Sequence, residues 1–328
     1  MHPNNIKTRK KPQKKLHNNL FDEKNCNFAS KKCTTKCNGN NVTVMNTYET
    51  IDLNDYTQIG EGGNGKTYVN PAVPGEILKV NHARLSTWEA VKREYDVSRA
   101  VADLGISVPA MHRIVRVGNA FATISQRIEG KRSLSRICHD EPERTEEMAR
   151  LLCCKGKELF ATQCNTQFFP SRRDQALLAI ERATFVSRKN RERLRTFVEG
   201  IAENSHCLHG DFQTGNIIQA GAEYYWIDLD RFGHGDPMFD IGHLYLICHI
   251  YAPMKRVQDI FHMTLKQFHR FWDAFAKEYT GQDDHAAFDA QAGRFAALDV
   301  VLRTVFQKPN FVEKLFFGFY VHQLMKHF

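Results

Sequence analysis

The segment from Cys207 to Asp228 restricts the possible folds more than any other part of this 328-residue sequence. Two short apolar runs flank a turn at residues 220–223, which is the pattern of a β-hairpin. Because a hairpin returns the chain, Asn216 at its start and Asp228 at its end are predicted to lie close together. Asp211 precedes Asn216 on a loop. We therefore expect two carboxylates and one carboxamide to converge at one end of a small sheet.

This set of oxygen atoms suits Mg2+, a hard cation that takes few protein ligands and completes its coordination with phosphate oxygens. Asn216 and Asp228 are the predicted metal ligands. Asp211 is the predicted base, which would orient an acceptor hydroxyl and take its proton. Phosphoryl transfer depends mainly on positioning and charge neutralisation, so a carboxylate of ordinary basicity is sufficient. The alternative is a loop in which Asp and Asn only form turns, and it leaves the spacing unexplained.

A glycine-rich stretch near the start of the patterned sequence fits two phosphate-binding motifs. The pattern G-x-G-x-x-G is formed by Gly60, Gly62 and Gly65. Residues 60–67 also fit the P-loop pattern G-x-x-x-x-G-K-[ST], which requires a helix directly after the motif. Pro71 and Pro74 forbid that helix, so a strand, a turn and a second strand are predicted. The glycines would then form a hairpin tip over a nucleotide; a plain glycine-rich hairpin is the alternative.

Lys79 lies between apolar neighbours in the second of these strands. A lysine in a buried strand needs a partner, and ATP phosphates together with a helix glutamate would supply one. The next segment has the pattern of a helix, with a capping box at Ser86 to Glu89 and Gly105 at its end. Glu94 falls near the apolar face of this helix and is the predicted partner of Lys79. In the alternative, both side chains face solvent.

The segment around Asp211 resembles a known catalytic loop. His209-Gly210-Asp211 with Asn216 is similar to the H-G-D-x-x-x-x-N loop of the aminoglycoside phosphotransferase and choline kinase families. Ile227-Asp228 resembles their counterpart of the kinase D-F-G motif. The resemblance runs from about Asp52 to Leu244 and implies an α+β, bilobal protein-kinase-like fold. Such a fold has a small antiparallel β-sheet N-lobe with one helix and a larger, mainly helical C-lobe.

The resemblance also implies cofactors and roles. The cofactors are ATP and Mg2+, with Lys79 on the ATP phosphates and Glu94 holding Lys79. Asp211 would be the catalytic base. Asn216 and Asp228 would bind the metal ion.

The resemblance further divides the chain into a nucleotide-binding N-lobe at 45–128 and a C-lobe with the acceptor pocket at 129–328. Residues 123–128 resemble the hinge strand that meets adenine through its backbone, which makes Gln126 and Ile128 the implied cofactor contacts.

Several nearby polar residues have implied structural roles. His209 would be structural, and Asp236 and Asp240 would brace the loop. Asp230 is either a second metal contact or a surface residue, and the surface position is favoured.

The acceptor is predicted to be a small molecule with a hydroxyl group. Only residues 229–239 separate Asp228 from Asp240, which leaves no room for the peptide-docking segment of a protein kinase. Helical patterns at 142–161, 173–201, 254–279 and 286–306 would form the acceptor pocket, and the aromatic-rich segment 311–328 would close the lobe. An aminoglycoside would need several carboxylates, and a choline-like cation would need an aromatic cage.

Candidate groups for both kinds of acceptor are present. The carboxylates are Asp273, Glu278, Asp283 and Asp284, and the aromatic residues are Tyr245, Tyr251, Trp272 and Phe275. An aminoglycoside, choline, ethanolamine or a sugar therefore all remain open. A P-loop NTPase, a protein kinase and a non-catalytic nucleotide-binding protein are the less favoured functions.

The net charge of +8 does not indicate a nucleic-acid-binding body. Residues 1–44 contain ten basic and two acidic residues, so the rest of the chain is neutral. This Lys- and Asn-rich segment is predicted to be a disordered tail, and Met45 is a possible native start. No apolar run reaches the ~20 residues that a membrane-spanning helix needs, and the N-terminus has no signal-peptide core. We therefore expect a cytoplasmic protein without a membrane partner.

Overall fold

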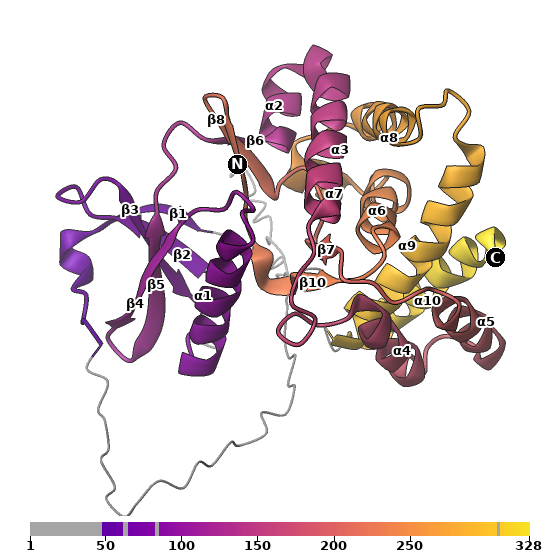
Figure 1. Cartoon of the computed structure of the whole chain (residues 1–328), viewed down its shortest axis with the longest axis horizontal. Coiled ribbons are helices and arrows are strands. Elements are labelled where there is room, and N and C mark those ends of the chain that lie inside the picture. Colours follow the sequence, from indigo (N-terminus) through magenta and orange to yellow (C-terminus); the bar gives the residue numbers. More distant parts are fainter. Residues whose placement is uncertain (1–47, 62–64, 83–84, 307–308) are drawn as a thin grey trace, which may run out of the picture.

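The computed structural model describes residues 48–61, 65–82, 85–306 and 309–328. These residues form two lobes, a smaller one built on a β-sheet and a larger one built mostly from helices (Figure 1). The predicted α+β, bilobal fold is therefore confirmed. The predicted tail at 1–44 and Gly62 of the glycine motif lie outside the described residues, and the division at residue 128 stays a prediction.

The N-lobe sheet has five antiparallel strands in the order β1-β2-β3-β5-β4. Their bounds are β1 Thr57–Glu61, β2 Gly65–Val69, β3 Glu76–Asn81, β4 Met111–Val117 and β5 Ala120–Gln126. Lys79 pairs with Thr67 on one side and Thr123 on the other, so the lysine sits on the central strand. A Cβ added at Gly65 would lie 2.4 Å from the Val80 carbonyl oxygen, which explains a glycine where β2 meets β3.

Helix α1, Trp88–Asp103, contacts strands β4 and β5 (Figure 1). Its N-cap is Thr87, whose hydroxyl accepts a hydrogen bond from the Ala90 N–H at 3.3 Å. The predicted capping box beginning at Ser86 is therefore wrong by one residue. The physical reason is that the Ser86 hydroxyl donates to the carbonyl of Asn81, at the end of β3, and is not directed at the helix. A hydroxyl committed to the strand end leaves capping to the next residue.

The C-lobe contains nine named helices within the described residues. Their bounds are α2 Leu134–Asp140, α3 Thr145–Ala161, α4 Arg172–Arg182, α5 Arg188–Glu199, α6 Met238–Tyr245, α7 Lys255–Phe261, α8 Leu265–Thr280, α9 Ala286–Phe306 and α10 Phe311–Leu324. Helix α6 packs against α9, and α3 packs against α8. The predicted helical stretch 173–201 divides into α4 and α5, because Ser187 caps a new helix by accepting from the Asn190 N–H.

Two hydrophobic cores support the lobes. The C-lobe core is large and includes the fully buried Phe212, Trp272 and Phe275. The N-lobe core contains four buried residues, Leu78, Val115, Ala122 and Ile124. Since stability scales with buried apolar area, the C-lobe is the more firmly held of the two.

The segment 311–328 was predicted to close the C-lobe, and helix α10 does so with only one of its two faces. Phe317, Val321 and Leu324 are buried against the rest of the lobe. The opposite face exposes the large apolar residues Phe311, Val312, Leu315, Phe316 and Phe319. The prediction took the aromatic-rich segment as a whole to close the lobe, but one helix presents two faces and only one of them can pack on α9. Within the described residues, no helix combines the length and the apolar character needed to cross a bilayer.

Candidate active site

The predicted hairpin is present and it presents the catalytic segment. Strands β8, Ile217–Ala220, and β9, Glu223–Trp226, pair antiparallel directly after Asn216. The Ile227 N–H donates to the Asn216 carbonyl at 3.0 Å. Asp228 is the next residue after Ile227, so it lies close to Asn216, where the hairpin begins. Asp228 has φ 58° and ψ 58°, a left-handed conformation that is uncommon for a residue other than glycine. Such backbone conformations are concentrated at functional sites.

The loop before Asn216 is fixed by Asp240 of α6. The Asp240 carboxylate accepts from the N–H of His209 at 2.6 Å and from the N–H of Gly210 at 2.8 Å. Burial raises the pKa of Asp240 to about 6, although Arg172 and the two N–H groups act in the opposite direction. Asp240 therefore braces the loop, and it does so from 1% exposure.

His209 makes the second brace. Its Nε2–H donates to the carbonyl of Ile227 at 2.9 Å, which joins the loop to the end of the hairpin. Complete burial lowers the pKa of His209 to about 4, and this outweighs the opposing effect of Asp211. The imidazole is thus neutral near pH 7 and acts as a hydrogen-bond donor to the backbone.

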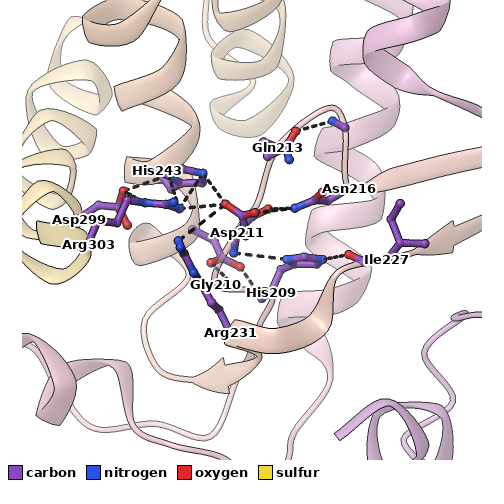
Figure 2. Close-up of polar contacts among 12 residues, drawn as sticks. His209, Gly210, Asp211, Gln213, Asn216, Ile227, Arg231, His243, Asp299 and Arg303 are labelled. Carbon is purple, nitrogen blue, oxygen red and sulfur yellow. Dashed lines mark hydrogen bonds and ion pairs between the residues drawn. The ribbon is translucent and has the colours of Figure 1, made fainter. Parts of the chain in front are cut away.

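Asp211 stands at the centre of the site, with partners on both carboxylate oxygens (Figure 2). Asn216 donates from Nδ2 to Asp211 Oδ2 and to the Asp211 carbonyl, each at 2.8 Å. On the other side, Oδ1 accepts from Arg303 Nη2 at 2.9 Å and lies 3.1 Å from His243 Nε2. Arg231 Nη1 is 4.0 Å from the same oxygen. The structure therefore brings Asp211 and Asn216 into direct contact.

The surrounding charges keep Asp211 ionised. Burial alone would raise the pKa of this carboxyl, but Arg303, the hydrogen bond from His243 and the charge of Arg231 hold the pKa well below its usual range. Asp211 is therefore a carboxylate with little affinity for a proton. This suits a group that orients a hydroxyl more than one that stores its proton.

Three residues of this site were missed by the sequence analysis: His243, Asp299 and Arg303. His243 comes from α6, and the other two come from α9. The two helices approach closely, because a Cβ added at Gly242 would lie 2.5 Å from the Cβ of Phe295. A usable signal existed in the sequence: Asp299 and Arg303 are one helical turn apart in the mostly apolar stretch 295–306, and buried charges require partners.

Lys79 and Glu94 also meet. Lys79 Nζ donates to Glu94 Oε1 at 2.8 Å, and Asn81 Nδ2 donates to the other oxygen of Glu94 at 3.0 Å. Burial lowers the pKa of Lys79, but Glu94, Asp230 and Asp228 together raise it above its ordinary value. The two aspartates come from the C-lobe, so the N-lobe lysine faces the end of the hairpin. Asp230 is exposed as predicted, yet its charge acts at this site.

The oxygen atoms near the hairpin fit a hard divalent cation. Asn216 uses Nδ2 for both bonds to Asp211, which directs its Oδ1 away from that carboxylate. Asp228 is exposed and lies near Lys79, where phosphate oxygens would complete a coordination shell. Across the described residues, no three His, Cys, Asp or Glu side chains form a ready metal site. The donor set is thus one carboxylate and one amide oxygen.

The hinge region leaves free backbone groups for a ligand. The Gln126 N–H donates to the Ala110 carbonyl at 2.8 Å, so that group already has a partner within the sheet. Ile128 lies just beyond β5, and its N–H and carbonyl form no hydrogen bond with another described residue. Gly60 and Gly65 lie on β1 and β2. Within this segment, the N–H and carbonyl of Ile128 are therefore the backbone groups available to a ligand.

The fold and the site define a protein-kinase-like phosphotransferase. A lysine–glutamate pair on a five-stranded sheet and its helix faces a loop that carries a carboxylate and an amide. A model described as the phosphotransferase enzyme family matches residues 55–279. The chain belongs to this family of phosphotransferases.

Solved structures show the same fold. The apo form of a thermostable mutant of aminoglycoside phosphotransferase APH(4)-Ia is 16% identical, with a TM-score of 0.55, and the match covers 83% of this chain and 94% of that one. The amicoumacin kinase hAmiN, in complex with AMP-PNP, Ca2+ and its substrate Ami, is 15% identical, with a TM-score of 0.55 and coverage of 85% and 90%. No curated protein matches the chain in sequence.

Proposed function

We propose that this protein transfers the γ-phosphate of ATP to a hydroxyl group of a small molecule. The observation that carries the proposal is the arrangement of Asp211, Asn216 and Asp228 at one hairpin, opposite Lys79. Each of the four residues has a chemical task in phosphoryl transfer. The neighbour APH(4)-Ia is known in a ternary complex with ADP and hygromycin B, which supports a nucleotide and a small acceptor here.

In this proposal the N-lobe holds the nucleotide. The strand ends at Gly60 and Gly65 lie over the phosphates. The Gln126 N–H already has a partner in the sheet, so the Gln126 carbonyl and the backbone groups of Ile128 meet the adenine. Lys79 contacts the phosphates as a point charge, and Glu94 keeps the ammonium group in place. Asn81 supports this arrangement because it holds the second oxygen of Glu94.

Asn216 and Asp228 would hold Mg2+ through Oδ1 and the carboxylate. When bound, the ion neutralises the negative charge of the phosphate groups. Oxygen ligands of this type match its preference. The complex of hAmiN with AMP-PNP and Ca2+ supports the use of a divalent ion with the nucleotide.

Asp211 orients the acceptor hydroxyl and takes its proton. The hydroxyl oxygen forms a bond to the γ-phosphorus, the bond from that phosphorus to the β,γ-bridging oxygen breaks, and ADP leaves with the electron pair. The low pKa of Asp211 is compatible with this role, because the proton is transferred only as the new bond forms.

The aromatic residues considered for a cage do not favour a quaternary ammonium as the acceptor. Trp272 and Phe275 are fully buried, and Tyr245 and Tyr251 are 8% and 6% exposed, so the aromatic residues considered for a cage belong to the core. Of the carboxylates considered for an aminoglycoside, Asp273, Asp283 and Asp284 are exposed and Glu278 is half-buried. Asp273 and Asp283 have side chains that are 63% and 87% exposed. Neither set selects an acceptor, so the proposal covers small hydroxyl compounds in general.

The experiment is a screen for ATP consumption with Mg2+ and aminoglycosides, choline, ethanolamine, homoserine and sugars, followed by mass spectrometry of the acceptor. We expect one class of acceptor to gain a single phosphoryl group. No phosphorylated product is expected when EDTA is added to remove Mg2+. ATP binding by calorimetry without turnover of any acceptor would indicate a non-catalytic nucleotide-binding protein and would contradict the proposal.

A further inference from the structure

The two carboxylate oxygens of Asp211 have different surroundings. Arg303 Nη2 and His243 Nε2 both lie on Oδ1, at 2.9 Å and 3.1 Å (Figure 2). Oδ2 has one side-chain partner, Asn216 Nδ2 at 2.8 Å. Each carboxylate oxygen offers about two lone-pair sites. The sites on Oδ1 are therefore filled, whereas Oδ2 keeps one site for another donor.

Arg303 is held in place from the other side. Its Nε donates to Asp299 Oδ2 at 2.8 Å, and the two side chains are 7% and 12% exposed. His243 Nδ1 lies 3.0 Å from the same Asp299 oxygen. Arg303 Nη2 is also 3.0 Å from the His243 ring nitrogens. Together with Asp211, these three residues form one mostly buried group that connects α6 and α9 to the catalytic loop.

We propose that Arg303, anchored by Asp299, is a positioning residue that fixes Asp211 through Oδ1 and leaves Oδ2 to receive the acceptor hydroxyl. This inference rests on the proposed function, because it assumes that Asp211 meets the acceptor. A guanidinium group suits the task, since it only donates hydrogen bonds and is not deprotonated in proteins. It cannot take the proton from the acceptor itself.

The arrangement defines which oxygen reacts. Oδ2 lies on the side of Asn216, a proposed metal ligand, so an acceptor hydroxyl bound to Oδ2 lies between Asp211 and the phosphate site. Without Arg303, the carboxylate keeps only His243 on Oδ1 and Asn216 on Oδ2, so its orientation is less firmly fixed. A misplacement of about 1 Å in a reacting group can cost on the order of 100-fold in rate. Arg303 should therefore control turnover and leave ATP binding unchanged.

The test compares variants of Arg303 with a control variant on the same helix. Arg303→Met removes the donor, and Arg303→Lys keeps a point charge. Since a buried Asp299 without its guanidinium costs stability, Arg303→Met is also made together with Asp299→Asn. Arg294→Met is the matched control, because Arg294 lies on the same helix and donates to the carbonyl of His327, away from Asp211. Turnover is measured with Mg·ATP and the best acceptor from the screen, or with water as acceptor.

We expect kcat to fall on the order of 100-fold in both Arg303→Met variants, with KM for ATP changed by less than about threefold. Arg303→Lys should recover part of the loss, and Arg294→Met should match the wild type. In an Asp211→Asn background, Arg303→Met should cause no further loss, because the residue acts through Asp211. Crystal structures give a second measurement: the Asp211 carboxylate should leave its wild-type orientation in the Arg303→Met proteins.

The outcomes separate this inference from the proposed function. Wild-type kcat and an unchanged Asp211 orientation in folded Arg303→Met proteins, with Asp211→Asn inactive, would overturn the positioning role alone. An active Asp211→Asn protein would overturn the proposed function as well. A rise in KM for ATP without a fall in kcat would show that Arg303 serves nucleotide binding and would also overturn the inference.

Discussion

Each lobe holds its functional side chains with a charged pair, and the two pairs differ in burial and in sequence separation. In the N-lobe, Lys79 and Glu94 meet at 2.8 Å with side chains that are 24% and 14% exposed. In the C-lobe, Arg303 and Asp299 meet at 2.8 Å with side chains that are 7% and 12% exposed. The first pair joins a strand to the next helix. The two residues of the second pair lie on one helix, and Arg303 also donates to Asp211, 92 residues away in the sequence.

The two pairs are therefore suited to different tasks. The N-lobe pair is the more exposed of the two and lies beside a core of four buried residues, so it is suited to a ligand that enters and leaves. The C-lobe pair is embedded in the main core, where an unpaired charge is costly and the geometry is fixed. Changes in the N-lobe pair should therefore affect nucleotide binding, and changes in the C-lobe group should affect the chemical step.

Outside Asp211 itself, the largest effect among the predictions that test this division is expected for Lys79→Met. Removing the ammonium group takes away a charge that would contact the ATP phosphates, so kcat/KM for ATP should fall on the order of 100- to 1000-fold. Calorimetry should show weaker binding of ATP. Lys92→Met is the control, because Lys92 lies on α1 but pairs with the exposed Asp96. Unchanged ATP affinity in Lys79→Met would remove the binding role of the N-lobe pair.

The next effect concerns stability of the small lobe. A Cβ at Gly65 meets the backbone of Val80 at 2.4 Å, whereas a Cβ at Gly60 meets only the Thr67 hydroxyl, at 2.7 Å, which can rotate away. Gly65→Ala should therefore lower the free energy of unfolding by about 2 kcal/mol, and Gly60→Ala by much less. Thermal unfolding of the two variants measures this difference. Equal stabilities would mean that β2 and β3 are not packed as described.

A smaller effect is expected for Asp240→Asn. The substitution leaves one acceptor oxygen where the carboxylate accepts from two N–H groups, so the loop loses one of its two bonds from Asp240. We expect kcat to fall about 10-fold, with ATP affinity preserved. Steady-state kinetics with the best acceptor would check this. A change in ATP affinity with normal kcat would contradict the assignment of the C-lobe to the chemical step.

The smallest effect is expected in the pH profile. Asp211 must be ionised to take a proton, and its pKa is held well below the usual range by Arg303, His243 and Arg231. Lowering the pH protonates a base only near its pKa, so Asp211 should stay active down to about pH 5. The profile of kcat at saturating Mg·ATP should therefore show no fall from Asp211 between about pH 5 and pH 8. A midpoint in that range that moves in Arg303→Lys would contradict this.

The sequence was sufficient where structure depends on neighbouring residues. The hairpin after Asn216 follows from two apolar runs and a turn, and the contact between Lys79 and Glu94 follows from a strand and an amphipathic helix. The predicted lobes and the family resemblance are confirmed, whereas the roles of individual site residues stay predictions.

The remaining features depend on contacts that no local pattern encodes. Arg303 and Asp211 meet only because α6 and α9 pack closely at Gly242, and that packing is a property of the whole lobe. The exposed face of α10 could not be predicted, because aromatic content does not say which face of a helix finds a partner. The cap of α1 moved by one residue because the hydroxyl of Ser86 was used by the end of β3.

The most direct test of the account is ATP consumption by Asp211→Ala at saturating Mg·ATP and acceptor, on protein whose ATP affinity has been measured by calorimetry. The account predicts a loss of kcat of at least about 1000-fold while the dissociation constant of ATP stays within about threefold of the wild type. Turnover at the wild-type rate would show that Asp211 is not the catalytic base and would contradict the division of labour between the lobes.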